Sequence, residues 1–255
     1  MKILEYTIGI LFYILCFCCF VPFNPKLTNE NKFKKDAEMY FPNSTFIEVK
    51  KERKGQKNYS FENDEFKFEI SDKVEDSTDS GVPPFVKDKE ISSSYFTNLI
   101  QYKEEEIQQL CNKYNVDYYN GIFYGDGSYV IAKENELDEK LDNAIKTTFV
   151  IDNYNGIEFN FYVQNKNDIP IVFDLLNDIE NSLSPYYPKK SVEFFKFEKR
   201  LIIYNNLNNS LNAKRNKLLY DVVEFPNDWS NNYYTMETEI LNEYNNAILN
   251  GKIKN

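Results

Sequence analysis

A run of 18 residues without a charge, Tyr6 to Phe23, constrains this chain more than any other feature. An α-helix of about 20 apolar residues crosses the roughly 30 Å hydrocarbon core of a bilayer, so this run is just long enough to span it. A core helix of a globular domain is rarely so long and so apolar. We therefore expect residues 1–23 to form a transmembrane anchor or signal segment that contacts the membrane through residues 6–23.

Three fates of this segment are consistent with its residues. A cleaved signal peptide normally has small residues before the cut, whereas this segment ends in the bulky Phe20–Phe23, and cleavage would make the protein secreted. An acylated cysteine also prefers a small residue before it; Cys18 has Leu15 three positions earlier but Phe17 directly before it. An uncleaved signal anchor needs only length and hydrophobicity, and we favour it.

The charges that flank the segment give conflicting indications of orientation. Lys2 precedes it, while Lys26, Lys32, Lys34 and Lys35 follow it, and a count of basic residues alone places the domain in the cytoplasm. Large domains, however, are translocated largely regardless of charge, and the short N-terminal flank resembles that of an export signal. We expect an extracytoplasmic domain, with a cytoplasm-facing one as the alternative.

Composition indicates that the rest of the chain, after the hydrophobic segment, is a folded, acidic domain. Hydrophobic residues make up 42% of the chain and aromatic residues 16%, well above the content of disordered chains. The net charge is −10, and an acidic surface repels phosphate backbones, so we expect no nucleic acid partner. We expect a polar tether over residues 24–35 and a single domain over residues 36–255, with a sub-boundary in the loop 71–90 as an alternative.

The chain contains no histidine, and one of its four cysteines lies outside the hydrophobic run. Ser-His-Asp and Cys-His mechanisms and histidine-ligated zinc are therefore excluded. Cys16, Cys18 and Cys19 lie inside the run, which leaves Cys111 alone in the domain and precludes an intrachain disulfide framework there. We expect no cofactor, and any catalysis would depend on carboxylates, lysine or tyrosine.

The hydrophobic pattern of the first part of the domain predicts a short helix and two strands. The helix covers residues 36–40, and the first strand, residues 45–50, carries Ile47 and Val49 on one face. Residues 61–70 form the second strand, in which apolar and charged residues alternate. Its apolar face consists of Phe66, Phe68 and Ile70, and its polar face contains Lys67 and Glu69.

Apolar residues recur at helical spacing from Phe96 to Tyr114, which predicts one helix. Cys111 lies on this stripe and, with no histidine to activate it, is interpreted as a small buried hydrophobe rather than a nucleophile. The stripe consists of Phe96, Leu99, Ile100, Ile107, Leu110, Cys111 and Tyr114.

Three hairpins that alternate with helices are predicted beyond residue 120. The strongest turn signal is Asn155-Gly156, between strands 147–152 and 157–164. The other hairpins cover residues 122–132, around the turn Gly125-Asp126-Gly127, and residues 192–204. The helices have apolar stripes within residues 137–145, 172–179 and 236–248, with Asp168 capping the second and Gly251 closing the third.

This order of elements predicts an α+β fold: an N-terminal hydrophobic helix followed by a two-layer domain of antiparallel hairpins backed by helices. In the strand 157–164, Ile157, Phe159 and Phe161 alternate with polar residues, which indicates a sheet covered on one face only. No strand leads through a Gly-rich turn into a helix, so a nucleotide-binding α/β fold is disfavoured.

Two groups of charged residues are candidate sites. Acidic residues gather in the predicted surface loop 71–84, where calcium is a weak hypothesis, because their spacing matches no defined calcium loop and a solvated loop explains them. They are Asp72, Glu75, Asp76 and Asp79. Basic residues gather at a hairpin tip that the tether places near the membrane, where they could contact anionic head groups; a solvated tip is the alternative. They are Lys50, Lys51, Arg53, Lys54 and Lys57.

The combination of a hydrophobic start, a tether and an acidic, Lys- and Asn-rich domain is typical of a cell-envelope protein. We expect a membrane-anchored or exported binding or interaction module without catalysis, whose partner is another envelope protein. Two alternatives stay open. One is a hydrolase that acts on envelope polysaccharide through a pair of carboxylates, and the other is a cytoplasm-facing immunity or scaffold protein.

Overall fold

The computed structural model describes residues 26–53, 55–76, 87–119, 145–152, 156–195, 197–205, 217–224 and 229–249. The predicted membrane segment, the hairpin predicted over residues 122–132 and most of the helix predicted over residues 137–145 lie outside these ranges. Within them, no helix is both long enough and apolar enough to cross a membrane.

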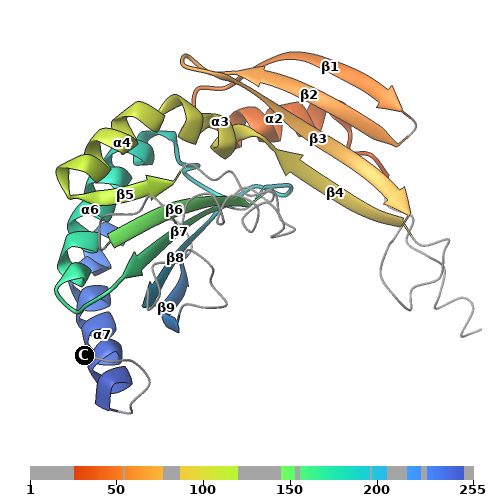
Figure 1. The fold of residues 1–255 in the computed structure, drawn as a ribbon. Coiled ribbons are helices and arrows are strands. Elements are labelled where there is room, and N and C mark those ends of the chain that lie inside the picture. Colours follow the sequence, from red (N-terminus) through yellow and green to blue (C-terminus); the bar gives the residue numbers. More distant parts are fainter. Residues whose placement is uncertain are drawn as a thin grey trace, which may run out of the picture.

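The first sheet is an antiparallel meander of four strands in the order β1-β2-β3-β4, and helix α2 (Glu30–Tyr40) packs against one of its faces (Figure 1). Phe33 of α2 contacts Tyr59 at a ring-centroid distance of 4.5 Å, and Phe41, directly after the helix, contacts Phe68 at 5.0 Å. The strands are β1 (Thr45–Arg53), β2 (Gln56–Glu62), β3 (Lys67–Asp76) and β4 (Lys87–Ser93).

The second sheet has five strands in the order β5-β6-β7-β8-β9, with parallel pairs β5–β6 and β7–β8 and antiparallel pairs β6–β7 and β8–β9. Helices α4, α6 and α7 lie along one side of it (Figure 1). The strands are β5 (Val116–Tyr119), β6 (Ile145–Asp152), β7 (Gly156–Val163), β8 (Glu198–Asn205) and β9 (Lys217–Glu224). The helices are α3 (Tyr95–Tyr102), α4 (Glu104–Lys113), α6 (Asp168–Leu183), the 3₁₀ turn η1 (Ser184–Tyr186) and α7 (Trp229–Leu249).

One cluster of buried side chains joins the two sheets. Phe195, from the segment between η1 and β8, places its ring 5.2 to 5.5 Å from Tyr40, Phe41 and Phe33 beneath the first sheet. Two residues later, Phe197 stacks on Phe96 of α3 at 4.8 Å. The late part of the chain therefore completes the core under the early part.

The α+β class is confirmed, and antiparallel pairing holds throughout the first sheet. The second sheet is mixed, because α6 separates β7 from β8 and a helical crossover returns the chain parallel to the strand it left. The prediction that β7 has one wet face is wrong: Asn160 and Tyr162 are 3% and 5% exposed. Tyr162 stacks on Tyr204, and Asn160 donates a 2.8 Å hydrogen bond to Glu158.

The early elements differ from their predicted bounds for local reasons. Helix α2 begins at Glu30, six residues before the predicted start, because the Asn29 side chain caps it by accepting from the Lys32 N–H. The second half of the expected tether is therefore helical. Residues 61–70 form a hairpin rather than one strand, since the Asn63 side chain accepts from the N–H groups of Glu65 and Phe66 and closes a turn.

Three further predictions are corrected by the register. Ile47 falls at a bulge in β1 and is 42% exposed, so it does not share a buried face with Val49. The predicted helix 96–114 is two helices that meet at Lys103. The strand predicted over residues 192–197 is absent from the described part of that segment, and β8 pairs instead with β9.

Candidate binding site

The outer face of the first sheet, opposite α2, is polar across three neighbouring strands. The inward positions of β2 and β3 carry Tyr59, Phe61, Phe68 and Ile70, all of them buried. Because side chains alternate along a strand, the residues between them face outward. They are Gln56, Asn58 and Ser60 on β2, Glu69, Ser71 and Lys73 on β3, and, opposite these, Glu90 and Ser92 on β4.

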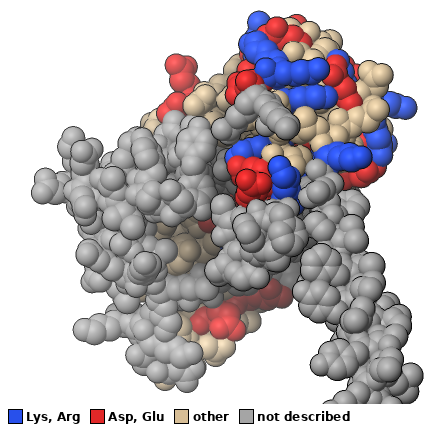
Figure 2. Space-filling view, turned by 90° about the vertical axis from the view of Figure 1, so that its right-hand side faces the viewer, with Lys and Arg blue, Asp and Glu red and all other residues tan. Residues whose placement is uncertain are grey.

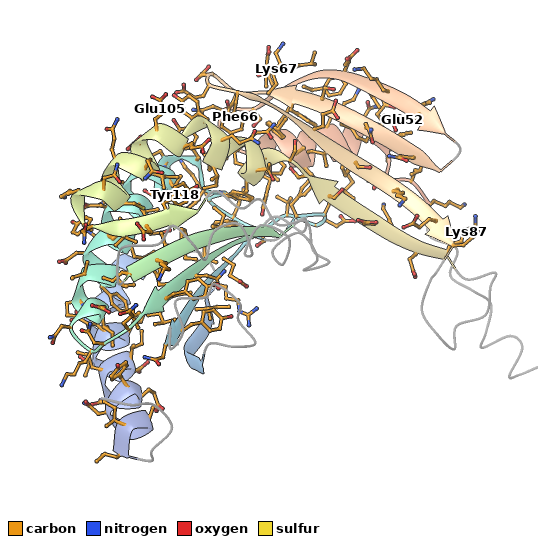
Figure 3. All side chains as sticks on the ribbon, in the orientation of Figure 1. Glu52, Phe66, Lys67, Lys87, Glu105 and Tyr118 are labelled. Carbon is orange, nitrogen blue, oxygen red and sulfur yellow. The ribbon has the colours of Figure 1, made fainter. Side chains whose placement is uncertain are left out.

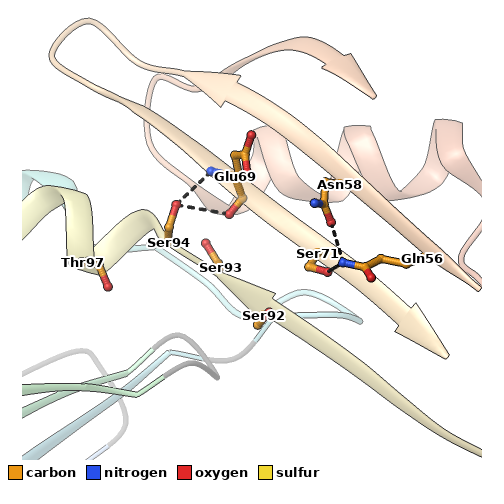
Figure 4. A pocket seen from close by; sticks show the side chains of 8 residues that line it. All are labelled: Gln56, Asn58, Glu69, Ser71, Ser92, Ser93, Ser94 and Thr97. Atoms are coloured by element: carbon orange, nitrogen blue, oxygen red, sulfur yellow. Dashed lines mark hydrogen bonds between the residues drawn. The ribbon is translucent and has the colours of Figure 1, made fainter. Parts of the chain in front are cut away.

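On β2, β3 and β4 the middle of this outer face is uncharged, with Glu69 on one side of it and Lys73 and Glu90 on the other, and Lys50 of β1 lies opposite Asn58. Asn58 lies opposite Ser71, and Ser71 lies opposite Ser92, so three short polar side chains form a row across β2, β3 and β4. A groove of about 220 Å³ follows this row (Figure 4). We call it the neutral groove; its lining is Gln56, Asn58, Glu69, Ser71, Ser92, Ser93, Ser94 and Thr97.

Hydrogen bonds fix the polar atoms of the neutral groove. The Gln56 side-chain amide donates to Asn58 Oδ1 at 3.3 Å and to Ser71 Oγ at 3.4 Å, as the dashed lines in Figure 4 show. At the other end, Ser94 Oγ accepts from the Glu69 N–H at 2.9 Å. A ligand would therefore meet donors and acceptors that are already oriented, which lowers the entropic cost of binding.

Helix α3 closes one end of the neutral groove. Ser93 Oγ accepts from the Tyr95 N–H at 3.1 Å, which helps to start the helix. Asn98 donates to the Lys67 carbonyl at 2.7 Å and ties the first turn of α3 to β3. Thr97 is thereby placed at the end of the row of serines (Figure 4).

The chemistry of the neutral groove suits recognition more than reaction. Among its lining residues Glu69 is the one carboxylate, and none is a lysine, tyrosine or cysteine. Hydrolysis of a glycosidic bond normally needs a second carboxyl group, about 5 to 9.5 Å from the first. Hydroxyl and amide groups, by contrast, both donate to and accept from a neutral polar ligand. The groove is also smaller than typical enclosed pockets of about 300 to 1,000 Å³, so it fits part of a larger ligand.

The structure separates the acidic residues of the calcium hypothesis. Asp72, Glu75 and Asp76 belong to β3 rather than to a loop, and Asp79 lies outside the described residues. Asp72 is fully buried and lies 3.5 Å from Lys89, whereas Glu75 pairs with Lys73. No group of three or more acidic or cysteine side chains that could hold a metal occurs in the described part of the chain.

The basic residues do form a hairpin tip, as predicted, because Arg53 of β1 pairs with Gln56 of β2. We call residues 50–57 the basic tip. Lys50 lies 2.9 Å from Glu48, whose carboxylate raises the pKa of the lysine, and Lys57 lies 3.6 Å from Glu30. Lys51 is exposed, while Lys54 and the side chain of Arg53 are not described.

Two cysteines were considered as candidate functional residues, and the structure describes one of them. Cys111 is fully buried, as predicted for a core residue, and burial raises the pKa of its thiol to about 12. It is therefore not a nucleophile at neutral pH. Cys18, the candidate for acylation, lies outside the described residues.

Comparisons of the chain with models of protein families, with characterised proteins and with solved structures give no match. The candidate site is therefore identified from the geometry of the neutral groove. Sequence reasoning missed this groove. The usable signal was the run Ser92-Ser93-Ser94 directly before a helix, together with uncharged polar residues at alternate positions from Gln56 to Ser60.

Proposed function

We propose that the protein is a membrane-anchored or exported cell-envelope protein that binds a neutral, hydrogen-bonding ligand without catalysis. The observation that carries the proposal is the uncharged row Asn58-Ser71-Ser92 across β2, β3 and β4, which lies between Glu69 on one side and Lys73 with Glu90 on the other. A ligand chain laid along this row, across the strands, meets successive side chains about 4.8 Å apart. A polysaccharide of the envelope, rich in hydroxyl groups, has the matching chemistry.

The arrangement favours weak binding. A hydrogen bond between uncharged groups contributes a net free energy of only about 0.5 to 1.5 kcal/mol. The groove is open, and no aromatic ring lines it for stacking against a sugar. We therefore expect dissociation constants in the range of about 10 µM to 1 mM, which corresponds to about 4 to 7 kcal/mol.

The test is binding of the full chain, in detergent micelles, to neutral polysaccharide fragments by isothermal titration calorimetry. Ser71→Lys places a charge at the centre of the groove and should weaken binding at least about tenfold, or 1.4 kcal/mol. Thr45→Lys is the matched control, because Thr45 is exposed at the far end of β1 and does not line the groove. Failure of the wild-type chain to bind, or equal weakening by both substitutions, would sink the proposal.

Two further measurements address the alternatives. New reducing ends in the polysaccharide after incubation would favour the hydrolase and overturn the non-catalytic proposal. For the side of the membrane, we propose an extracytoplasmic domain, because large domains are translocated largely regardless of the basic residues that flank the membrane segment. A C-terminal alkaline phosphatase fusion should then be active. Activity of a cytoplasmic reporter alone would place the domain inside and favour the immunity or scaffold alternative.

A further inference from the structure

The first described residues of the chain are fixed to one end of the first sheet. The backbone N–H of Thr28 donates to Asp72 Oδ2 at 2.6 Å, and Asp72 is fully buried. Lys89 of β4 completes this cluster: its Nζ lies 3.5 Å from Asp72 Oδ1 and donates to the Thr28 hydroxyl. The chain is therefore held before α2 begins.

The Thr28–Asp72–Lys89 cluster and the basic tip lie at the same end of the sheet. In the strand register, Asp72 of β3 lies opposite Lys57 of β2. The Val74 N–H donates to the Gly55 carbonyl at 2.8 Å. Figure 3 shows Glu52 and Lys87 at this end, and Lys67 at the opposite end of the same sheet.

The chain between the predicted membrane segment and this cluster is short. Phe23, the last residue of the predicted membrane segment, is five residues before Thr28. Five residues span at most about 18 Å when fully extended. An anchored chain therefore keeps this end of the sheet close to the lipid head groups, whichever side of the membrane the domain occupies.

The charge of the basic tip is opposite to that of the whole protein. Residues 50–57 contain five basic residues, Lys50, Lys51, Arg53, Lys54 and Lys57, and one acidic residue, Glu52. Figure 2, which looks at this end, shows Lys and Arg interspersed with Asp and Glu. Two acidic side chains of β3 pair with lysines of β4: Asp72 lies 3.5 Å from Lys89, and Asp76 lies 3.6 Å from Lys87. Within the tip, Lys50 and Lys57 pair with Glu48 and Glu30, whereas Lys51 is exposed.

We infer that the basic tip rests on anionic lipid head groups and holds the first sheet on end at the membrane surface. This inference rests on the membrane anchor of the proposed function. A basic segment is attracted to an anionic bilayer within about a Debye length of it, which is about 10 Å at 0.1 M salt, and a connection of at most about 18 Å allows the tip to come within that range. With the strands standing on end, the neutral groove faces along the membrane plane.

The test is acylation of lysine side chains in the full chain, reconstituted in vesicles and followed by mass spectrometry. One set of vesicles is pure phosphatidylcholine, and the other is about one third phosphatidylglycerol. We expect Lys51 to react about tenfold more slowly on the anionic vesicles. Lys67, exposed at the other end of the sheet, should react equally on both.

Variants sharpen this result. Lys50→Gln should reduce the protection of Lys51 on anionic vesicles, and Lys67→Gln should leave it unchanged. Equal reaction of Lys51 on both kinds of vesicle, or equal effects of the two variants, would overturn the lipid contact.

Flotation of the same samples on a density gradient separates the two proposals. A chain that floats with both kinds of vesicle but shows no protection of Lys51 keeps its anchor and loses the lipid contact. A chain that floats with neither loses both.

Discussion

Asp72 accepts a 2.6 Å hydrogen bond from the backbone N–H of Thr28, 44 residues earlier in the chain. An aspartate in the middle of a strand is a poor choice for that strand alone, because carboxylates are depleted in sheets and costly to bury. Here the cost is offset in part by the Thr28 N–H, which donates to Oδ2, and by the positive charge of Lys89, 3.5 Å from Oδ1. The contact joins the start of the domain to the sheet.

We predict that Asp72→Asn lowers the free energy of unfolding by about 2 kcal/mol, because an amide keeps the shape but leaves Lys89 without its charge partner. The cost stays below that of a fully buried pair, since the Lys89 side chain is 23% exposed. Urea unfolding of the full chain in micelles measures it. Asp88→Asn, at an exposed position of β4, should change the value by less than about 0.5 kcal/mol. Equal effects of the two substitutions would contradict the prediction.

Gly55, at the turn of the basic tip, should not tolerate a side chain. Its φ is +90°, and a Cβ atom there would lie 2.8 Å from the Val74 carbonyl oxygen. We expect Gly55→Ala to cost about 1 to 3 kcal/mol of unfolding free energy, from backbone strain and from the shift that the clash forces. Ser60→Ala, on the outer face of β2, is a control that should cost less than about 1 kcal/mol. A Gly55→Ala chain as stable as the wild type would show that the turn relaxes freely.

The helical faces were predictable, because amphipathic periodicity is local. The stripe from Phe96 to Tyr114 is buried or partly buried as expected. The break at Lys103 was not predictable, since the backbone bonds Lys103 N–H to Leu99 O and Ile107 N–H to Lys103 O continue across it. Apolar spacing does not record a one-residue interruption between two helices.

Strand pairing and the burial of polar side chains depend on residues far apart in the sequence, and several predictions about them were wrong. The turn at Asn63 contains no glycine or proline and depends on side-chain hydrogen bonds to two backbone N–H groups. From the sequence alone, Asp72 is predicted to lie in a loop. Its position in a strand is explained only by its contacts with Thr28 and Lys89. The neutral groove was invisible for the same reason, because Asn58, Ser71 and Ser92 become neighbours only through the register.

The buried thiol of Cys111 predicts a loss of stability at alkaline pH. The folded protein keeps this proton until about pH 12, whereas the unfolded chain releases it near the ordinary value of 9. Above pH 9 the unfolded state therefore binds fewer protons, and stability falls as pH rises, by up to about 1.4 kcal/mol per pH unit from this group.

Unfolding free energies from pH 8 to pH 11 test this prediction against Cys111→Ala. The substitution has its own cost from the smaller side chain, but that cost does not depend on pH. Buried tyrosines such as Tyr59, whose pKa is raised to about 12, contribute equally to both proteins. The wild type should lose stability more steeply above pH 9, and parallel curves would refute the assignment.

Glu180 of α6 and Lys199 of β8 form a buried ion pair. We expect that replacing one of the two residues destabilises the fold, whereas replacing both has a much smaller effect. The Lys199 Nζ lies 2.6 Å from Glu180 Oε2, and the Tyr187 hydroxyl donates to Glu180 Oε1 at 2.6 Å. The two charged side chains are 10% and 4% exposed. We expect Glu180→Gln to cost about 3 kcal/mol, because it removes the carboxylate charge that lies 2.6 Å from the buried lysine charge.

Replacing the lysine as well removes that penalty. Methionine has a similar length and no charge, so Lys199→Met combined with Glu180→Gln should recover most of the loss, while Tyr187 still finds the glutamine oxygen as an acceptor. Chemical unfolding of the two single variants and the double variant gives the coupling energy, expected between about 1 and 3 kcal/mol. Additive losses would show that the two side chains contribute independently, and that α6 and β8 are joined by apolar packing rather than by this pair.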